Sequence, residues 1–185
     1  VPLPRIMRPE GTELVPLVPR LAALPIGIRD AVGGDTLTVE RIAAIVRGYR
    51  RRVEGNLVVL VDYLQLIRSR DRFERRHELI GHVCRELKAI ALRESVPVIV
   101  AAQLNRSVEQ RGKEARPVMS DLAESGDIEK NADQIVFLHR PLGDSATHMG
   151  VSKYRMGACF GADVEYVGDR CLFVDRGAVT REEWQ

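Results

Sequence analysis

The 185-residue sequence has few cysteines, and they are poorly placed for thiolate chemistry. Cys84, Cys159 and Cys171 are odd in number and contain no CxxC pair. Such a set is typical of reduced cysteines in a cytosolic protein and disfavours a zinc or redox site built from thiolates. We therefore expect a cytoplasmic protein.

Long apolar runs are also lacking. No stretch approaches the roughly 18 to 20 apolar residues of a membrane span, and no basic segment followed by an apolar one opens the chain. We expect no membrane partner. Net charge is low too, +2 from 28 Lys and Arg against 26 Asp and Glu, so any contact with nucleic acid must depend on where the cations lie.

What is present fits one ordered domain, with 45% hydrophobic and 29% charged residues. Six prolines lie in the first 25 residues and exclude a long helix there. We expect a proline-rich arm with short helical turns over residues 1–24, followed by the domain over residues 25–185. Ile26 and Ile28 alternate around Gly27 and predict a short strand.

The middle of the chain alternates strands and helices. Helical periodicity predicts helices over residues 38–51, capped by Thr38, and over about 73–94. Apolar runs at 57–61, 97–102 and 134–138 predict three buried strands, and the first is expected to be buried on both faces. The order predicts an α/β fold with a mostly parallel sheet flanked by helices.

The last part of the chain has shorter strand patterns. They lie around Val151, over 164–167 and over 172–174, and glycines separate them. Such spacing predicts antiparallel hairpins that extend the sheet.

Polar residues follow two of the predicted strands. Asp62 ends the run 57–61, where an acid in phosphoryl-transfer ATPases holds Mg2+; the alternative is a turn or cap Asp. Gln103 ends the run 98–102, where an amide can contact a terminal phosphate or its attacking water; the alternative is an amide bonded to backbone. The polar loop after Gln103 carries Arg106, Arg111 and further cations and joins two strand ends, where ligands gather in such sheets.

Three segments together are specific. They resemble successive helicase motifs of the DnaB family in order and spacing, and they cover Val61–Ile67, Gln103–Arg111 and Ser120–Asp133. The resemblance runs from about residue 25 to 173, with a looser echo in the arm. It implies a RecA-like three-layer core and, in complete members, a homo-hexameric ring that hydrolyses ATP or another NTP with Mg2+ and moves along single-stranded DNA.

The resemblance also implies roles for individual residues. Asp62 corresponds to the magnesium-site acid and Gln103 to the phosphate sensor. Arg106, Glu124 and Gly126 correspond to residues of loops lining the central channel, where contacts to the DNA backbone are independent of sequence. Primase and a helicase loader are the partners that the family implies.

One further segment resembles a family motif, the Lys-x-Arg-Asn-Gly hairpin. Lys153-Tyr154-Arg155-Met156-Gly157 matches it except at Met156. By this resemblance Lys153 and Arg155 act on the neighbouring subunit's nucleotide, with Arg155 as an arginine finger. The alternative is a solvated strand whose two cations point to one face.

The sequence departs from the family in one major respect. It contains no G-x-x-x-x-G-K-[ST] motif and no counterpart of the first strand or of the catalytic Glu. We therefore expect little nucleotide hydrolysis by this chain alone and an apolar sheet surface without a partner. Ala123 also replaces a usual Arg. The alternative function is a truncated, inactive DnaB-like module that binds DNA or joins a ring.

Overall fold

The computed structural model describes residues 15–30, 37–105, 107–112, 115–122, 125–141 and 146–180. The chain divides into two compact units. The helical unit comprises residues 30–135 and 152–158, and the strand unit comprises residues 1–29, 136–151 and 159–185. Each unit is described by itself.

Among its described residues, the helical unit contains four α-helices, two strands and two 3-10 helices. In chain order these are α3 (Val39–Arg50), β1 (Val59–Val61), η2 (Leu64–Leu66), α4 (Arg76–Glu94), β2 (Val98–Val100), α5 (Ser107–Gln110), η3 (Met119–Asp121) and α6 (Ser125–Asn131).

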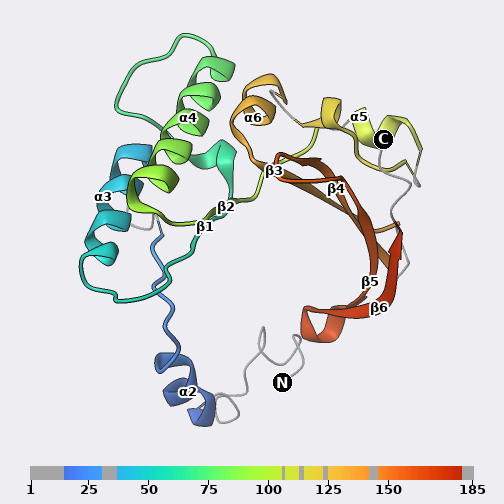
Figure 1. Cartoon of the computed structure of the whole chain (residues 1–185), viewed down its shortest axis with the longest axis horizontal. Helices are drawn as coiled ribbons and strands as arrows, with labels where there is room; N and C mark the ends of the chain where they lie inside the picture. The colour runs from blue at the N-terminus through green and yellow to red at the C-terminus, as the bar shows by residue number, and fades with distance from the viewer. Residues whose placement is uncertain are drawn as a thin grey trace. The chain divides into compact units, whose positions relative to one another are not determined.

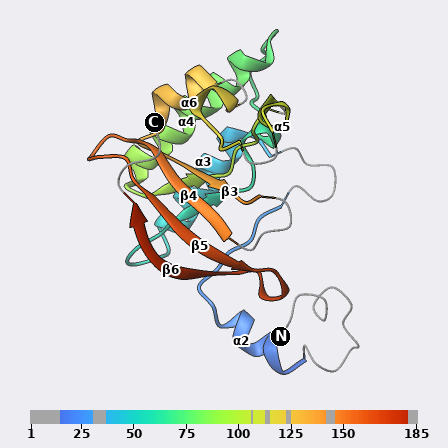
Figure 2. The same cartoon turned by 90° about the vertical axis from the view of Figure 1, so that its right-hand side faces the viewer.

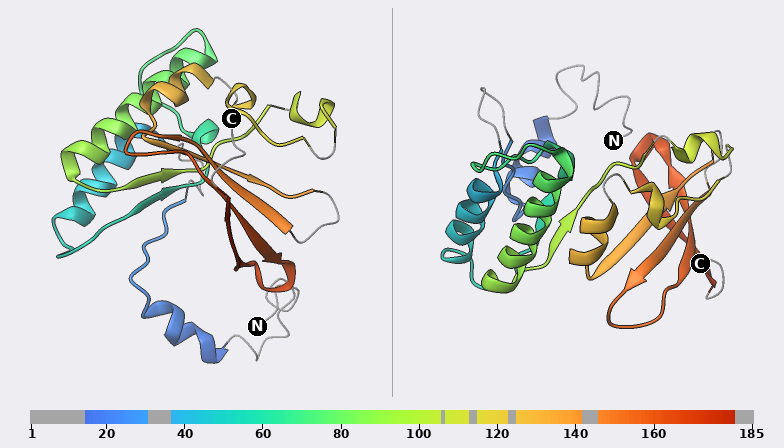
Figure 3. Two further views of the ribbon diagram at one scale, coloured as in Figure 1. Left: turned by 45° about the vertical axis from the view of Figure 1, so that its right-hand side comes forward. Right: turned by 90° about the horizontal axis from the view of Figure 1, so that it is seen from above.

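Both long helices predicted from the sequence are confirmed. Thr38 caps α3, since its Oγ1 accepts a hydrogen bond from Arg41 N at 3.3 Å. Helix α4 begins at Arg76, about one turn later than predicted, and ends at Glu94. Ser95 caps it in the left-handed conformation at φ 52°. Figures 1 and 3 show α3 and α4 side by side.

The core of the helical unit lies where these helices pack on each other and on the short sheet. Its side chains are apolar and at most 6% exposed, as the helical periodicity predicts: Val39, Ile42 and Val46 of α3 and Ile80, Val83, Leu87 and Ile90 of α4. Gly81 of α4 lies close to α6, because a Cβ there would come within 2.6 Å of Asp127 Oδ2.

The two short strands form a parallel pair, as predicted. Val59 pairs with Val98 and Val61 with Val100, so the strands run in step. One face of the pair meets α4. Leu60 and Ile99 alternate to the other face and are 75% and 56% exposed. The prediction that β1 is buried on both faces is therefore wrong, because no described element covers the face that carries Leu60 and Ile99. This exposed apolar face agrees with the sheet surface that the sequence predicts to lack a partner.

The strand unit is built on an antiparallel sheet of order β3-β4-β5-β6, which Figure 2 shows most clearly. Its strands are β3 (Gln134–His139), β4 (Ala146–Tyr154), β5 (Gly161–Val167) and β6 (Leu172–Thr180). Strands β3 and β4 also extend into the helical unit. Antiparallel pairing of β4 with β5 and of β5 with β6 confirms the predicted hairpins. They do not extend the parallel pair, however, because β3 to β6 form a sheet separate from β1 and β2. The α/β fold class is confirmed.

The described part of the proline-rich arm forms short helical turns, as predicted. They are η1 (Val15–Leu17) and α2 (Val18–Ala22). Elsewhere in the strand unit, the 3-10 helix η4 (Gly168–Arg170) joins β5 to β6. The short strand predicted at Ile26 and Ile28 is wrong. These side chains are 66% and 79% exposed, so no burial favours an extended pairing there. Among the described residues, no helix has the length and apolarity needed to cross a bilayer.

Two leucines of α4 test the position of the core. Leu87 is 4% exposed and Leu92 is 67% exposed on the same helix. We expect Leu87→Ala to lower the free energy of unfolding by about 2–5 kcal/mol, because it leaves a cavity. Leu92→Ala should change it by less than about 0.5 kcal/mol. Urea unfolding followed by circular dichroism measures both, and equal losses would contradict the assigned face of α4.

Glu40 provides a pH-dependent link between α3 and the segment after β1. Burial raises the pKa of its carboxyl group. Hydrogen bonds from Ser69 Oγ at 2.8 Å, from Thr38 and from main-chain N–H groups including Arg70 N lower the pKa and together outweigh the effect of burial. The pKa falls from 4.5 to about 2. The ionised carboxylate therefore stabilises the fold above pH 4.5, and this stabilisation disappears as the pH falls toward 2.

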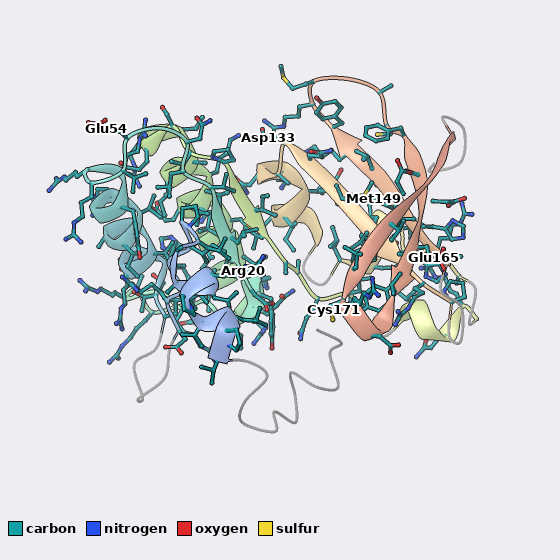
Figure 4. All side chains as sticks on the ribbon, turned by 90° about the horizontal axis from the view of Figure 1, so that it is seen from below. Arg20, Glu54, Asp133, Met149, Glu165 and Cys171 are labelled. Atoms are coloured by element: carbon teal, nitrogen blue, oxygen red, sulfur yellow. The ribbon has the colours of Figure 1, made fainter. Side chains whose placement is uncertain are left out.

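The variant Glu40→Gln tests this link. At pH 7 it should unfold at lower urea concentration than the parent protein, and the difference should shrink as the pH falls from 4.5 toward 2. The matched control is Glu54→Gln at the exposed turn after α3 (labelled in Figure 4). A difference between parent and Glu40→Gln that stays constant over this pH range would refute the role of the Glu40 charge.

Candidate nucleotide and DNA sites

Asp62 and Gln103 follow β1 and β2 at the same end of the parallel pair, as the sequence predicts. Main-chain hydrogen bonds continue past the strands, from Ala101 N to Val61 O at 2.9 Å and from Leu64 N to Ala101 O at 2.8 Å. Asp62 and Gln103 are both exposed. A carboxylate and an amide thus share one accessible sheet end, which suits ligand contact.

Gln65 is a buried amide that the sequence interpretation did not single out. It is 6% exposed, and its side chain makes two hydrogen bonds to the backbone of Gln103. Gln103 N donates to Gln65 Oε1 at 3.1 Å, and Gln65 Nε2 donates to Gln103 O at 3.4 Å. The side chain three residues after Asp62 therefore fixes the backbone of Gln103. Its only signal in the sequence is a polar residue inside the apolar run Leu64–Ile67.

The two ends of the segment between Leu104 and Leu122 are hydrogen-bonded to each other. Leu104 and Leu122 form an antiparallel bridge, and Asn105 N donates to Asp121 O at 2.7 Å. Asp121 is 4% exposed, forms an ion pair with Arg111, and accepts from Val118 N at 2.7 Å. The basic loop predicted from sequence is therefore a closed segment with a buried carboxylate.

Three sequence-predicted DNA residues lie in this segment or shortly after it in sequence. Arg106 and Glu124 lie outside the described residues. Gly126 is exposed in the first turn of α6, and a Cβ built on it would meet nothing within 4 Å. Open space at Gly126 leaves its main chain accessible to a ligand.

Lys153 and Arg155 both reach the C-terminal end of α6. Lys153 Nζ donates to Glu129 O, and Arg155 Nη2 donates to Lys130 O at 2.5 Å. These carbonyls belong to the last turn of the helix, whose partial negative charge favours cations. Both cations thus point to one face, a feature of the alternative interpretation of this segment, and their acceptors are carbonyls at a helix end.

Asp133, labelled in Figure 4, ties this hairpin to α4 and was not predicted. Its carbonyl accepts from Arg155 N at 2.9 Å, and its carboxylate lies 3.8 Å from Arg155 Nη1. The same carboxylate forms an ion pair with Lys88. An acid one residue before β3 gives no sequence signal, because its partners lie far along the chain.

Other ionisable groups have contacts of their own. His148 Nδ1 pairs with Asp163 Oδ1, and the ring of His82 lies 5.1 Å from that of Phe73. The hydrogen bond between the Tyr166 hydroxyl and Cys171 Sγ, 3.3 Å long, raises the pKa of Tyr166. In the part of the chain that is described, no group of three or more His, Cys, Asp or Glu could hold a metal ion.

The pairing of Gln65 with the Gln103 backbone is testable by stability. Gln65→Ala should lower the free energy of unfolding by about 1–3 kcal/mol, because it leaves buried polar groups of Gln103 unpaired. Gln103→Ala should change it by less than about 0.5 kcal/mol, since that side chain is exposed. Urea titrations of both variants give the comparison. A smaller loss for Gln65→Ala than for Gln103→Ala would disprove the fixing role.

Comparisons with known proteins agree with this geometry. The model of the DnaB-like helicase C-terminal domain matches residues 5–175. The chain is 39% identical over 137 residues to the replicative DNA helicase DnaB of Mycobacterium leprae, covering 74% of this chain and 22% of that protein. It is 36% identical over 168 residues to the DnaB of Leifsonia xyli, covering 86% and 35%. These shares mean that the chain spans only about a fifth to a third of such relatives.

Solved structures are similar as well. A DnaB-like replicative helicase, whose structure describes its interactions with primase, superposes with a TM-score of 0.82 at 28% identity, covering 94% of this chain and 44% of that one. A second solved structure, of an ATPase domain, superposes with a TM-score of 0.83 at 28% identity, covering 95% and 66%. The family match spans most of the sequence, and the chain therefore belongs to the family of DnaB-like helicase C-terminal domains.

Proposed function

We propose that this chain is part of the motor of an ATP-dependent replicative DNA helicase, which moves along single-stranded DNA as a hexameric ring. In this proposal residues 25–185 belong to the RecA-like motor and residues 1–24 form an arm before it. The supporting observation is the parallel pairing of Val61 with Val100, which brings Asp62 and Gln103 to one sheet end. Family membership supplies the rest.

Asp62 would hold Mg2+ at the nucleotide, directly or through water. Magnesium commonly binds one or two carboxylates together with substrate phosphates and water, so a single exposed acid at a strand end fits this ion. The ion would neutralise charge on the phosphates. Gln103 would contact the terminal phosphate or the attacking water through its amide, and Gln65 would hold the backbone of Gln103 in place.

Arg106, Glu124 and Gly126 would contact DNA in the channel of the ring. An Arg side chain and main-chain N–H groups suit phosphate contacts, which hold any DNA sequence and weaken as salt rises. The antiparallel bridge between Leu104 and Leu122 supports this assignment. Arg106 follows the first of these residues by two positions and Glu124 follows the second by two, so the bridge joins the chain just before both.

Lys153 and Arg155 would act on the nucleotide of the neighbouring subunit. Their present hydrogen-bond acceptors are neutral carbonyls of α6, and the Asp133 carboxylate lies 3.8 Å from Arg155 Nη1. An ionised phosphate accepts stronger hydrogen bonds than a neutral carbonyl, so a neighbour's nucleotide could take over these donors. Primase and a loader protein are the partners that this function would require, and the protein would act in the cytoplasm.

Arg106→Ala tests the DNA contact. Its dissociation constant for labelled single strands should rise by a similar factor for every sequence, and the dependence of log Kd on log salt should lose about one counterion. Fluorescence anisotropy over a salt series measures both quantities. Arg20→Ala on α2 removes the same charge elsewhere and is the matched control. A loss confined to certain base sequences would argue against a phosphate contact in the channel.

A further inference from the structure

Asp121 makes several contacts within the segment from Leu104 to Leu122. Its carboxylate side chain is 5% exposed, pairs with Arg111, and accepts from Val118 N at 2.7 Å. Its carbonyl accepts from Asn105 N at 2.7 Å. One residue therefore binds the start, the middle and the end of the segment.

A buried carboxylate requires such partners. An ionised acid without hydrogen-bond donors is strongly disfavoured inside a protein. Arg111 and the Val118 N–H supply these donors here. Removing Arg111 deprives the buried carboxylate of its charged partner, whereas removing the charge of Asp121 releases the partly exposed Arg111. Either change breaks the contact between the middle and the end of the segment.

Arg111 would otherwise be counted among the DNA-binding cations. It lies in the basic loop, and its side chain is 41% exposed. However, its guanidinium is engaged with Asp121 and also donates to Arg116 O at 3.4 Å. A phosphate would have to compete with an acid that has no other charged partner among the described contacts.

We infer that Arg111 and Asp121 are positioning residues for DNA binding: their ion pair clasps the segment Leu104–Leu122, which contains Arg106 and ends two residues before Glu124 in sequence, while Arg111 itself contacts no phosphate. This inference rests on the proposed DNA-binding function. It assigns Arg111 a role different from that of the other cations in the loop.

For Asp121→Asn, the inference predicts a change in DNA affinity opposite to the one expected from net charge alone. Asp121→Asn removes a negative charge, which by itself should strengthen binding to DNA. The clasp predicts weaker binding instead, because the neutral amide cannot hold Arg111 in place. Arg111→Ala should weaken binding by a similar factor, and Arg111→Lys should retain part of the affinity.

The experiment uses the full chain and a labelled oligothymidine. Anisotropy titrations over a salt series compare the parent protein with Asp121→Asn, Arg111→Ala and Arg111→Lys. The control is Asp169→Asn, which makes the same charge change on the exposed turn η4. We expect Asp121→Asn and Arg111→Ala each to raise Kd by about threefold or more, with the salt slope unchanged to within about half a counterion.

Limited digestion by a protease that cuts after Glu gives a readout independent of DNA. Asp121→Asn and Arg111→Ala both keep Glu109 and Glu114, and both variants should be cut faster at these residues than the parent protein. If Asp121→Asn fails to fold, the partly exposed Arg111 variants still carry this test.

Two results would overturn the inference. One is unchanged or tighter DNA binding by Asp121→Asn together with a loss of about one counterion in Arg111→Ala, which would make Arg111 a phosphate contact. The other is an unchanged cleavage rate in both variants. If the parent chain binds no DNA, the proposed function fails, and the clasp is still decided by the cleavage rates.

Discussion

The candidate nucleotide site depends on the parallel pairing of β1 with β2 and on the hydrogen bonds that continue it. Past the paired valines, Ala101 binds both Val61 and Leu64, and Gln65 then binds Gln103. These contacts occupy the main-chain groups that would otherwise be left unpaired where the strands end. Asp62 and Gln103 are thereby left exposed on a backbone that is fixed on both sides.

Much of the frame could be predicted from the sequence, because local patterns determine it. Helices α3 and α4 follow from periodicity and from the cap at Thr38, and strand ends follow from apolar runs that stop at Asp62 and Gln103. Periodicity does not tell whether a run is covered on one face or two. For that reason the exposure of Leu60 and Ile99 was missed.

The contacts that position the candidate sites were not predictable in the same way. Gln65 binds a residue 38 positions away, and Lys153 binds a carbonyl 24 positions away. Such pairings arise only when the chain has folded back on itself, and neither partner carries a distinctive neighbourhood in sequence. The resemblance to a family named candidate ligand-binding residues, whereas the contacts of the buried Gln65 and Asp121 emerged only from the structure.

The connection from α4 to β2 determines how the chain can change length without losing this site. Only Ser95, Val96 and Pro97 separate the helix from the strand, and Val96 is buried and bonded to Ala91 O at 3.0 Å. One inserted residue here would move Gln103 out of step with Asp62, since side chains alternate faces along a strand. The nine residues from Ile67 to Arg75, between η2 and α4, include an exposed stretch without helix or strand. Insertions and deletions in relatives should therefore gather before α4 and avoid the turn after it.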